Sequence, residues 1–487
     1  MAAADHKPVS ETTGGHPELK RTLGPLGLIS LGIGAIIGAG IFSITGTAAA
    51  EHAGPAIVLS FALACIGCVF AGLCYSELAS MIPQSGSAYT YTYAAFGSFA
   101  GWIIGWDLTL EYGVAAATVA VSWGGYFKGF LAGAGIELPA YLSTAPIGTD
   151  SEGHMVATGA LLNLPAMGIV LFLTGLLSIG IRESASVNGL MVILKVAIIL
   201  AVIAFGLPLI APANLDPFIP ENTGKFGEFG WSGILAGAGV IFFAYIGFDS
   251  VSVAAQEAKN PQRDLPIGIL GSLAFCTVLY ILMSLTMTGL AHYSTLKVDN
   301  PVSVAIASGG ESLKWLLPWV NLGAIAGLST VILVSLYGQT RIFYAMSRDG
   351  FLPATFARVH PKYNTPAQST LVIGVFVALI AGIFPLNVLG ELVSVGTLLA
   401  FMFVCTAVII LRETRPKVRR PFRVPFYPLT PILGILVCGA MVYPLLEESW
   451  LRLVGWLAIG VVIYVIYGAR HAKKPTWSLD DAPEEKS

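Results

Sequence analysis

Long apolar segments recur along the whole chain, and no other feature restricts its fold as strongly. A helix needs about 20 predominantly apolar residues to cross the hydrocarbon core of a bilayer. Twelve segments meet this requirement, at roughly 25–49, 55–82, 95–127, 161–181, 187–211, 231–255, 267–291, 316–346, 368–385, 388–411, 428–446 and 450–468. Only 11% of the 487 residues are charged, against about 25% in soluble globular proteins. We therefore predict an all-α polytopic membrane protein with twelve transmembrane helices.

The lysines and arginines predict how these spans are oriented, because cytoplasmic loops carry an excess of both. With the N-terminus inside, 20 of the 26 lie in inner segments, 5 lie in outer segments, and one, Lys195, lies within a span. Both tails, 1–24 and 469–487, are therefore expected in the cytoplasm. The polar first 24 residues contain no short apolar core with a cleavage site, so we expect the first span to direct insertion. The basic segment 412–428 is expected to lie beside anionic lipid headgroups.

Glycine residues interrupt the first and sixth predicted spans. The first contains Gly32, Gly34, Gly38 and Gly40 within "LGIGAIIGAGIF" (31–42), and the sixth contains Gly237, Gly239 and Gly247. One interpretation is close helix packing, since Gly34 and Gly38 have the four-residue spacing of a packing face. The other is a pair of broken helices, which is typical of transporters built from inverted repeats. In such helices, N–H groups at a half-helix start bind a carboxylate, and the carbonyls of the other half bind a cation or an ammonium.

Lys195 lies about eight residues, or roughly 12 Å, from the inner end of the fifth span. A cation at that depth is costly and indicates a functional role. A buried lysine can exchange its proton reversibly, which makes Lys195 a candidate proton carrier. The alternative is a permanent ion pair with a buried carboxylate.

Acidic residues also fall within the spans. Asp107 and Glu111 are four residues apart and so share one face of the third span. Two carboxylates at this spacing tend to retain a proton, so they either join a proton path or pair with polar backbone in the broken helices. Asp249 follows the sixth-span break and is expected to stabilise its inner half. Glu77, near an inner helix end, is expected to be solvated or to form part of a gate.

The sequence contains no motif for an enzyme, a cofactor or a metal site. The six cysteines all fall within apolar segments and are expected to be small core residues. The seven histidines lie in tails, loops or span ends, and the sequence has no metalloprotease, phosphate-loop or nucleophile-elbow motif. We therefore expect no enzyme, no cofactor, no metal site and no nucleic-acid partner.

Six motifs together resemble the amino acid–polyamine–organocation superfamily, and in particular its bacterial members similar to cationic amino acid transporters. They are "GIGAIIGAGIF" (32–42), "YSELASMIPQSGSAYTY" (75–91), "GWDLTLEYGVA" (105–115), "FFAYIGFDSVS" (242–252), "EAKNPQRDLPIGI" (257–269) and "YGQTRIFYAMSRDGFLP" (337–353). The resemblance extends from about residue 20 to residue 470, with the motifs in the expected order.

The resemblance implies a LeuT-type fold of five-plus-five inverted repeats with broken first and sixth helices. The repeats would be 25–211 and 231–411, followed by two additional helices at 428–468. It also implies proton-coupled uptake of amino acids across the cell membrane.

Carried onto this sequence, the resemblance assigns the substrate carboxylate to N–H groups of Ala39 and Gly40. It assigns the substrate ammonium to carbonyls of Ile36, Phe243 and Ile246, with the Phe243 ring as an outer lid.

The resemblance further implies that Lys195 replaces the sodium ion of sodium-coupled relatives, beside Gly38 and the hydroxyls of Ser329 and Thr330. Ser335 either faces the site, where it leaves room for a longer side chain, or packs against a neighbouring helix.

We therefore predict a proton-coupled amino acid symporter, with the proton as coupling ion and no sodium. An exchanger without net proton coupling and an amino acid sensor on a transporter scaffold are the alternatives. The expected partners are a free amino acid and membrane lipids, with a monomer as the expected state. The sequence leaves open whether the substrate is small and neutral, such as alanine, serine or glycine, or cationic, such as arginine or lysine.

Overall fold

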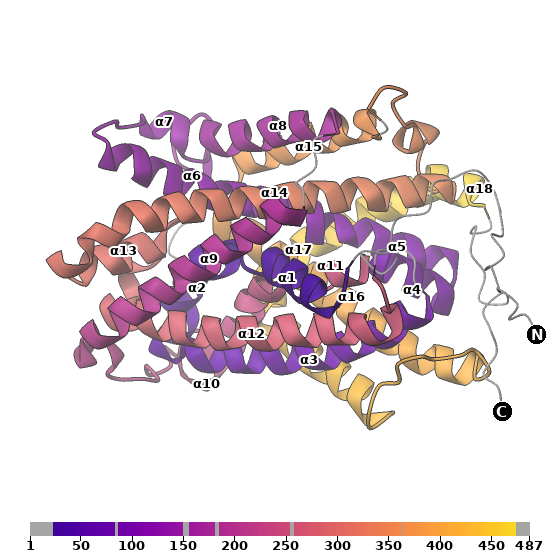
Figure 1. Cartoon of the computed structure of the whole chain (residues 1–487), viewed down its shortest axis with the longest axis horizontal. Coiled ribbons are helices and arrows are strands. Elements are labelled where there is room, and N and C mark those ends of the chain that lie inside the picture. The colour runs from indigo at the N-terminus through magenta and orange to yellow at the C-terminus, as the bar shows by residue number, and fades with distance from the viewer. Residues whose placement is uncertain are drawn as a thin grey trace, which may run out of the picture.

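The structure is a computed structural model, and it describes residues 23–82, 86–149, 155–180, 185–253, 258–363 and 365–473. Most of the two predicted tails, and the middle of the motif at 75–91, therefore lie outside the described residues. The helices form an elongated bundle in which most run along the long axis (Figure 1).

The first half of the chain contains the helices α1 (Pro25–Ile36), η1 (Gly40–Ile44), α2 (Thr45–Ala48), η2 (Ala49–Ala53), η3 (Gly54–Ala56), α3 (Ile57–Met81), α4 (Ser87–Phe96), α5 (Ser98–Leu108), η4 (Thr109–Val114), α6 (Ala115–Gly133), α7 (Ala140–Ser143), α8 (Leu164–Ser178), α9 (Ala185–Gly206), η5 (Leu207–Leu209) and η6 (Pro212–Leu215). Strands β1 (Ile147–Thr149) and β2 (Met155–Ala157) pair antiparallel between α7 and α8.

The second half contains α10 (Gly230–Ile241), η7 (Phe242–Tyr245), α11 (Ser250–Val253), α12 (Pro261–Leu290), η9 (Tyr293–Thr295), α13 (Pro301–Ser308), η10 (Glu311–Leu316), α14 (Leu317–Arg348), η11 (Ala354–Ala357), α15 (Ala367–Ile383), α16 (Leu386–Thr414), α17 (Leu429–Ile463), η12 (Tyr464–Gly468) and α18 (Ala469–His471). Each of the twelve predicted spans overlaps helical residues.

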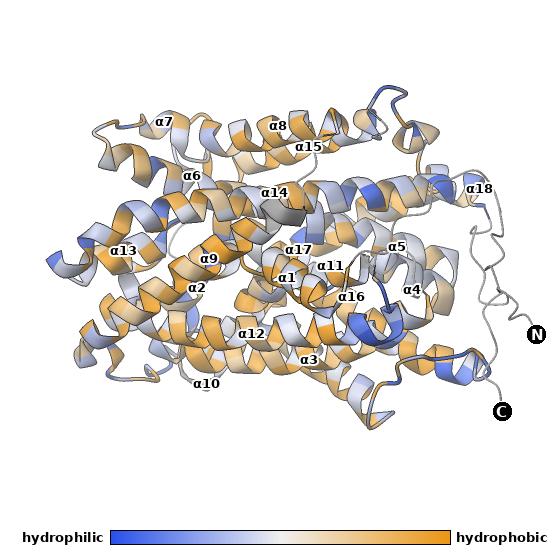
Figure 2. Ribbon diagram, in the orientation of Figure 1, coloured by the Kyte–Doolittle hydropathy of each residue, from blue (hydrophilic) through white to orange (hydrophobic). Residues whose placement is uncertain are grey.

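Eight stretches of the described chain are long and apolar enough to cross a membrane. They are Pro25–Met81, Gly189–Leu209, Gly230–Ser252, Pro261–Leu290, Glu311–Arg348, Leu386–Thr414, Leu429–Leu446 and Ser449–His471. The first of them contains two predicted spans, and two further predicted spans correspond to shorter apolar helices, Leu164–Ser178 and Ala367–Ile383. The third predicted span is divided among α5, η4 and α6. Hydrophilic residues gather at the two ends of the bundle, and the helices between them are mostly apolar (Figure 2).

The segment at 129–160 contains α7 and the β1–β2 pair. One feature of the fold differs from the prediction. Helix α17 is continuous from Leu429 to Ile463 although two spans were predicted there. Its two parts nevertheless have separate apolar stretches, and they pack against different helices. Gly434 lies beside Cys405 of α16, whereas the carbonyl of Gly460 accepts a hydrogen bond from Trp102 of α5.

The expectation that Glu77 is solvated is wrong. Its side chain is 1% exposed and forms an ion pair with Arg412 at the end of α16. Burial of a carboxylate requires such a partner, because an isolated buried charge is strongly unfavourable.

Candidate functional site

The first predicted span is interrupted at Ile37 and Gly38. Helix α1 ends at Ile36, Ile37 adopts an extended conformation with ψ of 100°, and the π-helical segment η1 begins at Gly40. The interruption is therefore shorter than the glycine-rich segment that predicts it. It leaves the last carbonyls of α1 available to other partners, since the carbonyls at a helix C-terminus lack intrahelical N–H donors.

The second interruption lies between η7 and α11. After Tyr245, Ile246 is extended with ψ of 134°, and Gly247 has φ of +117°. Side chains with a Cβ rarely adopt that conformation, so glycine is required at position 247. Helix α11 then begins at Ser250.

The two interruptions pack directly against each other. A Cβ built at Gly40 would overlap the Cα of Ala244, which lies in η7. A Cβ at Gly247 would lie 2.8 Å from the carbonyl carbon of Ala35 in α1. Each broken helix therefore places a glycine, in or next to its interruption, against the backbone of the other. By contrast, Gly32 packs against side chains of Ser272 and Val251, in agreement with the packing interpretation.

Lys195 lies near the middle of α9, is 0% exposed, and points at the end of α1. Its Nζ donates hydrogen bonds to the carbonyl oxygens of Gly34, at 2.9 Å, and Ile37, at 3.1 Å. A helix C-terminus carries partial negative charge, so an ammonium group stabilises the interrupted end. The lysine thus connects α9 to the first interruption.

A second buried donor reaches the same helix end. The Tyr280 hydroxyl, on α12, donates to the carbonyl oxygen of Ile36 at 2.9 Å. Side chains from α9 and α12 therefore bind three carbonyls at the end of α1, those of Gly34, Ile36 and Ile37. Tyr280 was not among the predicted site residues, although a tyrosine in an apolar span requires a partner for its hydroxyl.

The other residues predicted around Lys195 lie on α14 or against it. The Ser329 hydroxyl donates to Ile325 O at 2.8 Å and accepts from Trp123 Nε1 at 3.0 Å. The Thr330 hydroxyl donates to the carbonyl oxygen of Gly327 at 2.8 Å. Gly38 faces Val331.

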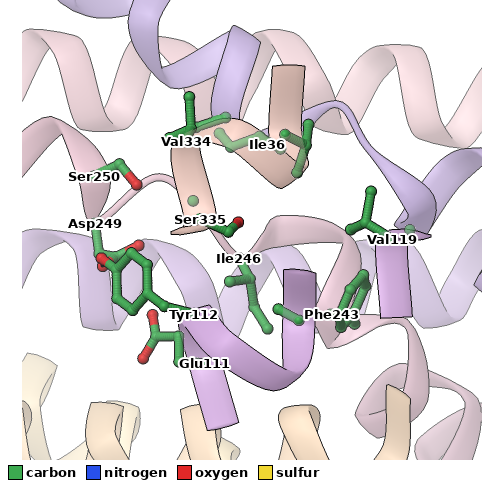
Figure 3. Close-up of a pocket in the computed structure, with 15 residues that line it drawn as sticks. Ile36, Glu111, Tyr112, Val119, Phe243, Ile246, Asp249, Ser250, Val334 and Ser335 are labelled. Carbon is green, nitrogen blue, oxygen red and sulfur yellow. The ribbon is translucent and has the colours of Figure 1, made fainter. Parts of the chain in front are cut away.

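A cavity lies beside the two interruptions, between α1, η1, η4, α6, η7, α11 and α14 (Figure 3). Its lining residues are mostly apolar: Ala35, Ile36, Gly40, Glu111, Tyr112, Ala115, Val119, Phe243, Ile246, Gly247, Asp249, Ser250, Val331, Val334 and Ser335. Ser335 therefore faces the cavity, one of the two orientations left open. A volume of about 30 Å³ accommodates about two water molecules, so a larger molecule enters only after the surrounding helices move.

Two of the predicted acidic residues, Glu111 and Asp249, lie at the polar end of this cavity. The Tyr112 hydroxyl donates to Oδ2 of Asp249, and the Ser87 hydroxyl donates to the same oxygen at 3.4 Å. Glu111 interacts electrostatically with both Asp249 and Asp107, and Glu111 and Asp249 lie on either side of the Tyr112 side chain in Figure 3. Tyr112 and Ser87 were not predicted as site residues.

These carboxyl groups are deeply buried. Within the part of the chain that the structure describes, both carboxylate oxygens of Asp107 have no hydrogen-bond partner. Two neighbouring buried carboxylates are unfavourable when both are ionised, so the pair of Glu111 and Asp249 is suited to hold a proton. Asp107 lies apart from the cavity, against Gly396 of α16.

Ala39 precedes η1, and Phe243 and Ile246 line the cavity from the second interruption. The carbonyl of Phe243 already accepts the backbone N–H of Ile246 at 3.2 Å. The structure thus brings Ile36, Gly40, Phe243, Ile246 and Ser335 to one cavity. Among the described residues, no group of three or more histidine, cysteine, aspartate or glutamate side chains could hold a metal ion.

Comparison with known proteins identifies the family. A family model described as amino acid permease matches residues 23–468. The chain is 46% identical to a branched-chain amino acid permease of Bacillus subtilis (strain 168), over 95% of this chain and 96% of that protein. It is 45% identical to a methylthioribose transporter of the same organism, over 93% of this chain and 95% of that protein. It is also 38% identical to the vacuolar cationic amino acid transporter 4 of Arabidopsis thaliana, over 82% of this chain and 65% of that protein.

These relatives are named as permeases and transporters, and the apolar helices agree with a multi-pass membrane protein. The chain therefore belongs to the amino acid permease family of the amino acid–polyamine–organocation superfamily.

Proposed function

We propose that the protein is a proton-coupled symporter that carries an aliphatic amino acid into the cell by alternating access, with Lys195 replacing a bound sodium ion. The observation that carries this proposal is the pair of hydrogen bonds from Lys195 Nζ to Gly34 O and Ile37 O. A fully buried ammonium group is thereby directed at the interrupted end of α1. Buried ionisable groups within spans mark proton relays and ion pathways in transporters.

The coupling follows from what the lysine does in its two protonation states. The protonated side chain donates to the α1 carbonyls and attracts the negative end of that helix. After deprotonation this attraction is lost, so the hold of α9 on the first interruption weakens. Ile36 lies between Gly34 and Ile37, whose carbonyls bind Lys195. The protonation of Lys195 and the position of the Ile36 carbonyl therefore depend on each other.

The backbone at the interruptions suits both charged groups of an amino acid. N–H groups of Ala39 and Gly40 at the start of the second half-helix would receive the carboxylate. Carbonyls of Ile36, Phe243 and Ile246 would receive the ammonium. The Phe243 ring lines the cavity and would act as the lid on the outer side.

The cavity walls favour an aliphatic side chain over a cationic one. Val119, Val331, Val334 and Ile246 are among the apolar side chains that line the cavity away from its acidic end. Contact with an apolar substrate side chain would remove both apolar surfaces from water, which is favourable. The Bacillus subtilis relative with 46% identity is named for branched-chain amino acids. Among the described residues that line the cavity, the acidic groups are Glu111 and Asp249, and we assign them to proton exchange rather than to a substrate cation.

The architecture that accompanies this function has twelve membrane crossings. They would comprise inverted five-helix repeats at 25–211 and 231–411, in which the broken helices α1–η1 and α10–α11 correspond, and two further helices at 428–468. Both termini would lie in the cytoplasm of a cell whose plasma membrane contains the protein. A monomer would be the transporting unit.

Reconstitution in liposomes tests the coupling. We expect the wild-type protein to accumulate labelled leucine when a proton gradient is imposed, without sodium. We expect Lys195→Ala to lose this accumulation at least tenfold, and Lys225→Ala, which changes an exposed lysine (70% exposed side chain), to retain it. Measurement of leucine exchange in the same vesicles, without a gradient, separates coupling from folding.

Two results would contradict the proposal. Unchanged gradient-driven accumulation by Lys195→Ala would remove the lysine from the coupling mechanism. Exchange without accumulation by the wild type would instead make the protein an exchanger.

A thermal-shift screen with the twenty amino acids tests the substrate class, because a ligand at 100 times its Kd stabilises the folded state by about 2.7 kcal/mol. Larger shifts with arginine and lysine than with leucine, isoleucine and valine would exclude the aliphatic class.

A further inference from the structure

The segment that connects α16 to α17 has a compact fold built around Arg420. This side chain is buried, and its guanidinium donates to the carbonyl oxygens of Leu411 at 2.7 Å, Val418 at 2.8 Å and Arg415 at 3.0 Å. A cation that binds the last carbonyls of a helix satisfies them and opposes the helix dipole. Arg420 therefore turns the chain back onto the end of α16 and orders the residues on either side of it.

Glu77 fixes the same segment to the end of α3. Its carboxylate accepts Arg412 Nε at 3.0 Å, Arg412 Nη2 at 2.5 Å, and the backbone N–H of Val424 at 2.6 Å. The Arg412 guanidinium also lies 4.2 Å from the centre of the Tyr427 ring. Arg412 and Arg420 thus bind partners within the protein, and these contacts hold the backbone of the segment in place.

Other basic residues of the segment are exposed at the protein surface. Lys417 and Arg419, on either side of the buried Val418, are both exposed, as are Arg415 and Arg423. The only acidic residue at 412–428, Glu413, accepts a hydrogen bond from the Tyr427 hydroxyl at 3.2 Å. The ordered segment therefore presents several positive charges at the end of the bundle where hydrophilic residues gather (Figure 2).

A large apolar side chain is exposed beside these charges. Phe426 is 82% exposed and has φ of +53°, a conformation that is unfavourable for a residue with a Cβ. Leu429, in the first turn of α17, is also exposed. A backbone held in an unfavourable conformation points to a role for the side chain it displays, and aromatic residues at the end of a span locate in the interface of the bilayer.

We propose that Lys417, Arg419, Phe426 and Leu429 form a binding surface for anionic phospholipid, called here the 417–429 surface. The lysine and arginine would contact the phosphate of the headgroup, and Phe426 and Leu429 would lie among the adjoining acyl chains. Basic clusters directly beside a transmembrane helix attract anionic lipids in this way. The buried contacts of Arg420 and Glu77 preorganise the surface, which reduces the conformational entropy lost when a lipid binds. The inference is independent of the substrate and the coupling ion.

Thermal unfolding of the full-length protein in detergent micelles tests this surface. We compare added phosphatidylglycerol, added phosphatidylcholine and added inorganic phosphate. For the wild type, phosphatidylglycerol is expected to raise the apparent melting temperature by at least about 3 °C more than phosphatidylcholine. The double variant Lys417→Gln/Arg419→Gln is expected to lose at least half of this difference. Lys417→Arg/Arg419→Lys, which keeps both charges, is expected to retain it.

A matched control is Lys225→Gln/Lys314→Gln, which removes two exposed lysines at the opposite end of the bundle. It is expected to respond to phosphatidylglycerol as the wild type does. Equal lipid responses of the wild type and Lys417→Gln/Arg419→Gln would overturn the proposal. The proposal would also be overturned if Lys225→Gln/Lys314→Gln lost as much of the phosphatidylglycerol response as Lys417→Gln/Arg419→Gln. A shift with inorganic phosphate as large as that with phosphatidylglycerol would overturn it too, because it would indicate a phosphate site without a lipid. Phe426→Ala is expected to weaken the phosphatidylglycerol response, and an unchanged response would remove the acyl-chain contact.

Discussion

Individual glycines at the two interruptions act through the absence of a side chain. At Gly40 the Cα of Ala244 occupies the place where a Cβ would be, whereas Gly32 and Gly38 meet only side chains, which can adjust. The close approach of two backbones at Gly40 is what allows η1 and η7 to lie beside the same cavity.

Gly40→Ala is therefore expected to reduce both stability and transport strongly. Overpacking of a close-packed core costs typically about 1–3 kcal/mol, and here the backbone of η7 must move. We expect a lower apparent melting temperature and loss of amino acid uptake. The matched control is Gly133→Ala at the end of α6, where nothing lies within 4 Å of a Cβ; it should retain both properties. Uptake by Gly40→Ala at the wild-type rate would show that this close contact is unnecessary.

Some site residues could be predicted from the sequence and others could not. Lys195 was identifiable because a charge in the middle of an apolar segment is costly and therefore informative. The glycines predicted both interruptions, although not that the first covers only Ile37 and Gly38. Tyr280 and Tyr112 gave no comparable signal, since an isolated tyrosine is common in a span, and their partners are distant in sequence.

At the scale of elements, hydropathy predicted where helices lie because a bilayer leaves few other structures available. It did not predict α4, α13 or the β1–β2 pair, which are short and lie outside the apolar spans. Nor did it predict that Arg412 and Arg420 turn inward. The sum of basic residues in a segment does not reveal which of them meet a buried carboxylate such as Glu77.

The contact between α3 and α16 at Glu77 is expected to stabilise the protein. Glu77→Gln would leave the guanidinium of Arg412 facing a neutral amide, and disruption of a buried ion pair costs about 3–5 kcal/mol. Glu311→Gln is the matched control, because its pair with Lys314 is exposed and such pairs contribute about 0–1 kcal/mol. Apparent melting temperatures in the same detergent measure both changes. Equal decreases in melting temperature in the two variants would mean that the ion pair of Glu77 contributes no more to stability than an exposed pair does.

At the scale of the whole molecule, hydrogen bonds connect η1, which borders the cavity at Gly40, to distant parts of the chain. The Ser43 hydroxyl, in η1, bonds to the Ser122 hydroxyl of α6 and donates to the carbonyl oxygen of Asp299 at 2.5 Å. The Tyr126 hydroxyl of α6 donates to Phe42 O at 2.5 Å. These bonds join the second part of the first broken helix to α6 and to the loop before α13. They connect residues up to 256 positions apart, which explains why the sequence did not reveal these contacts.

Ser122→Ala is expected to loosen the contact between η1 and α6, so that the neighbouring cavity is open to solvent more often. A net hydrogen bond contributes about 0.5–1.5 kcal/mol, so the open population should rise roughly 2- to 10-fold. A membrane-impermeant thiol reagent, applied from outside to a Ser335→Cys background, measures the change as a faster rate of modification. Ser178→Ala serves as control because that hydroxyl bonds within its own helix. Identical modification rates in the two variants would argue against a closing role for Ser122.

The contact of Gly40 with Ala244 also limits how sequences of this kind can diverge. The nearest atom is the Cα of residue 244, and every amino acid has one, so no second substitution there can compensate for a larger residue at position 40. The same holds for Gly247, whose neighbour is the carbonyl group of Ala35. New substrate preferences must therefore arise elsewhere around the cavity, at positions such as Val119 and Ser335, where a side chain rather than the backbone sets the available space.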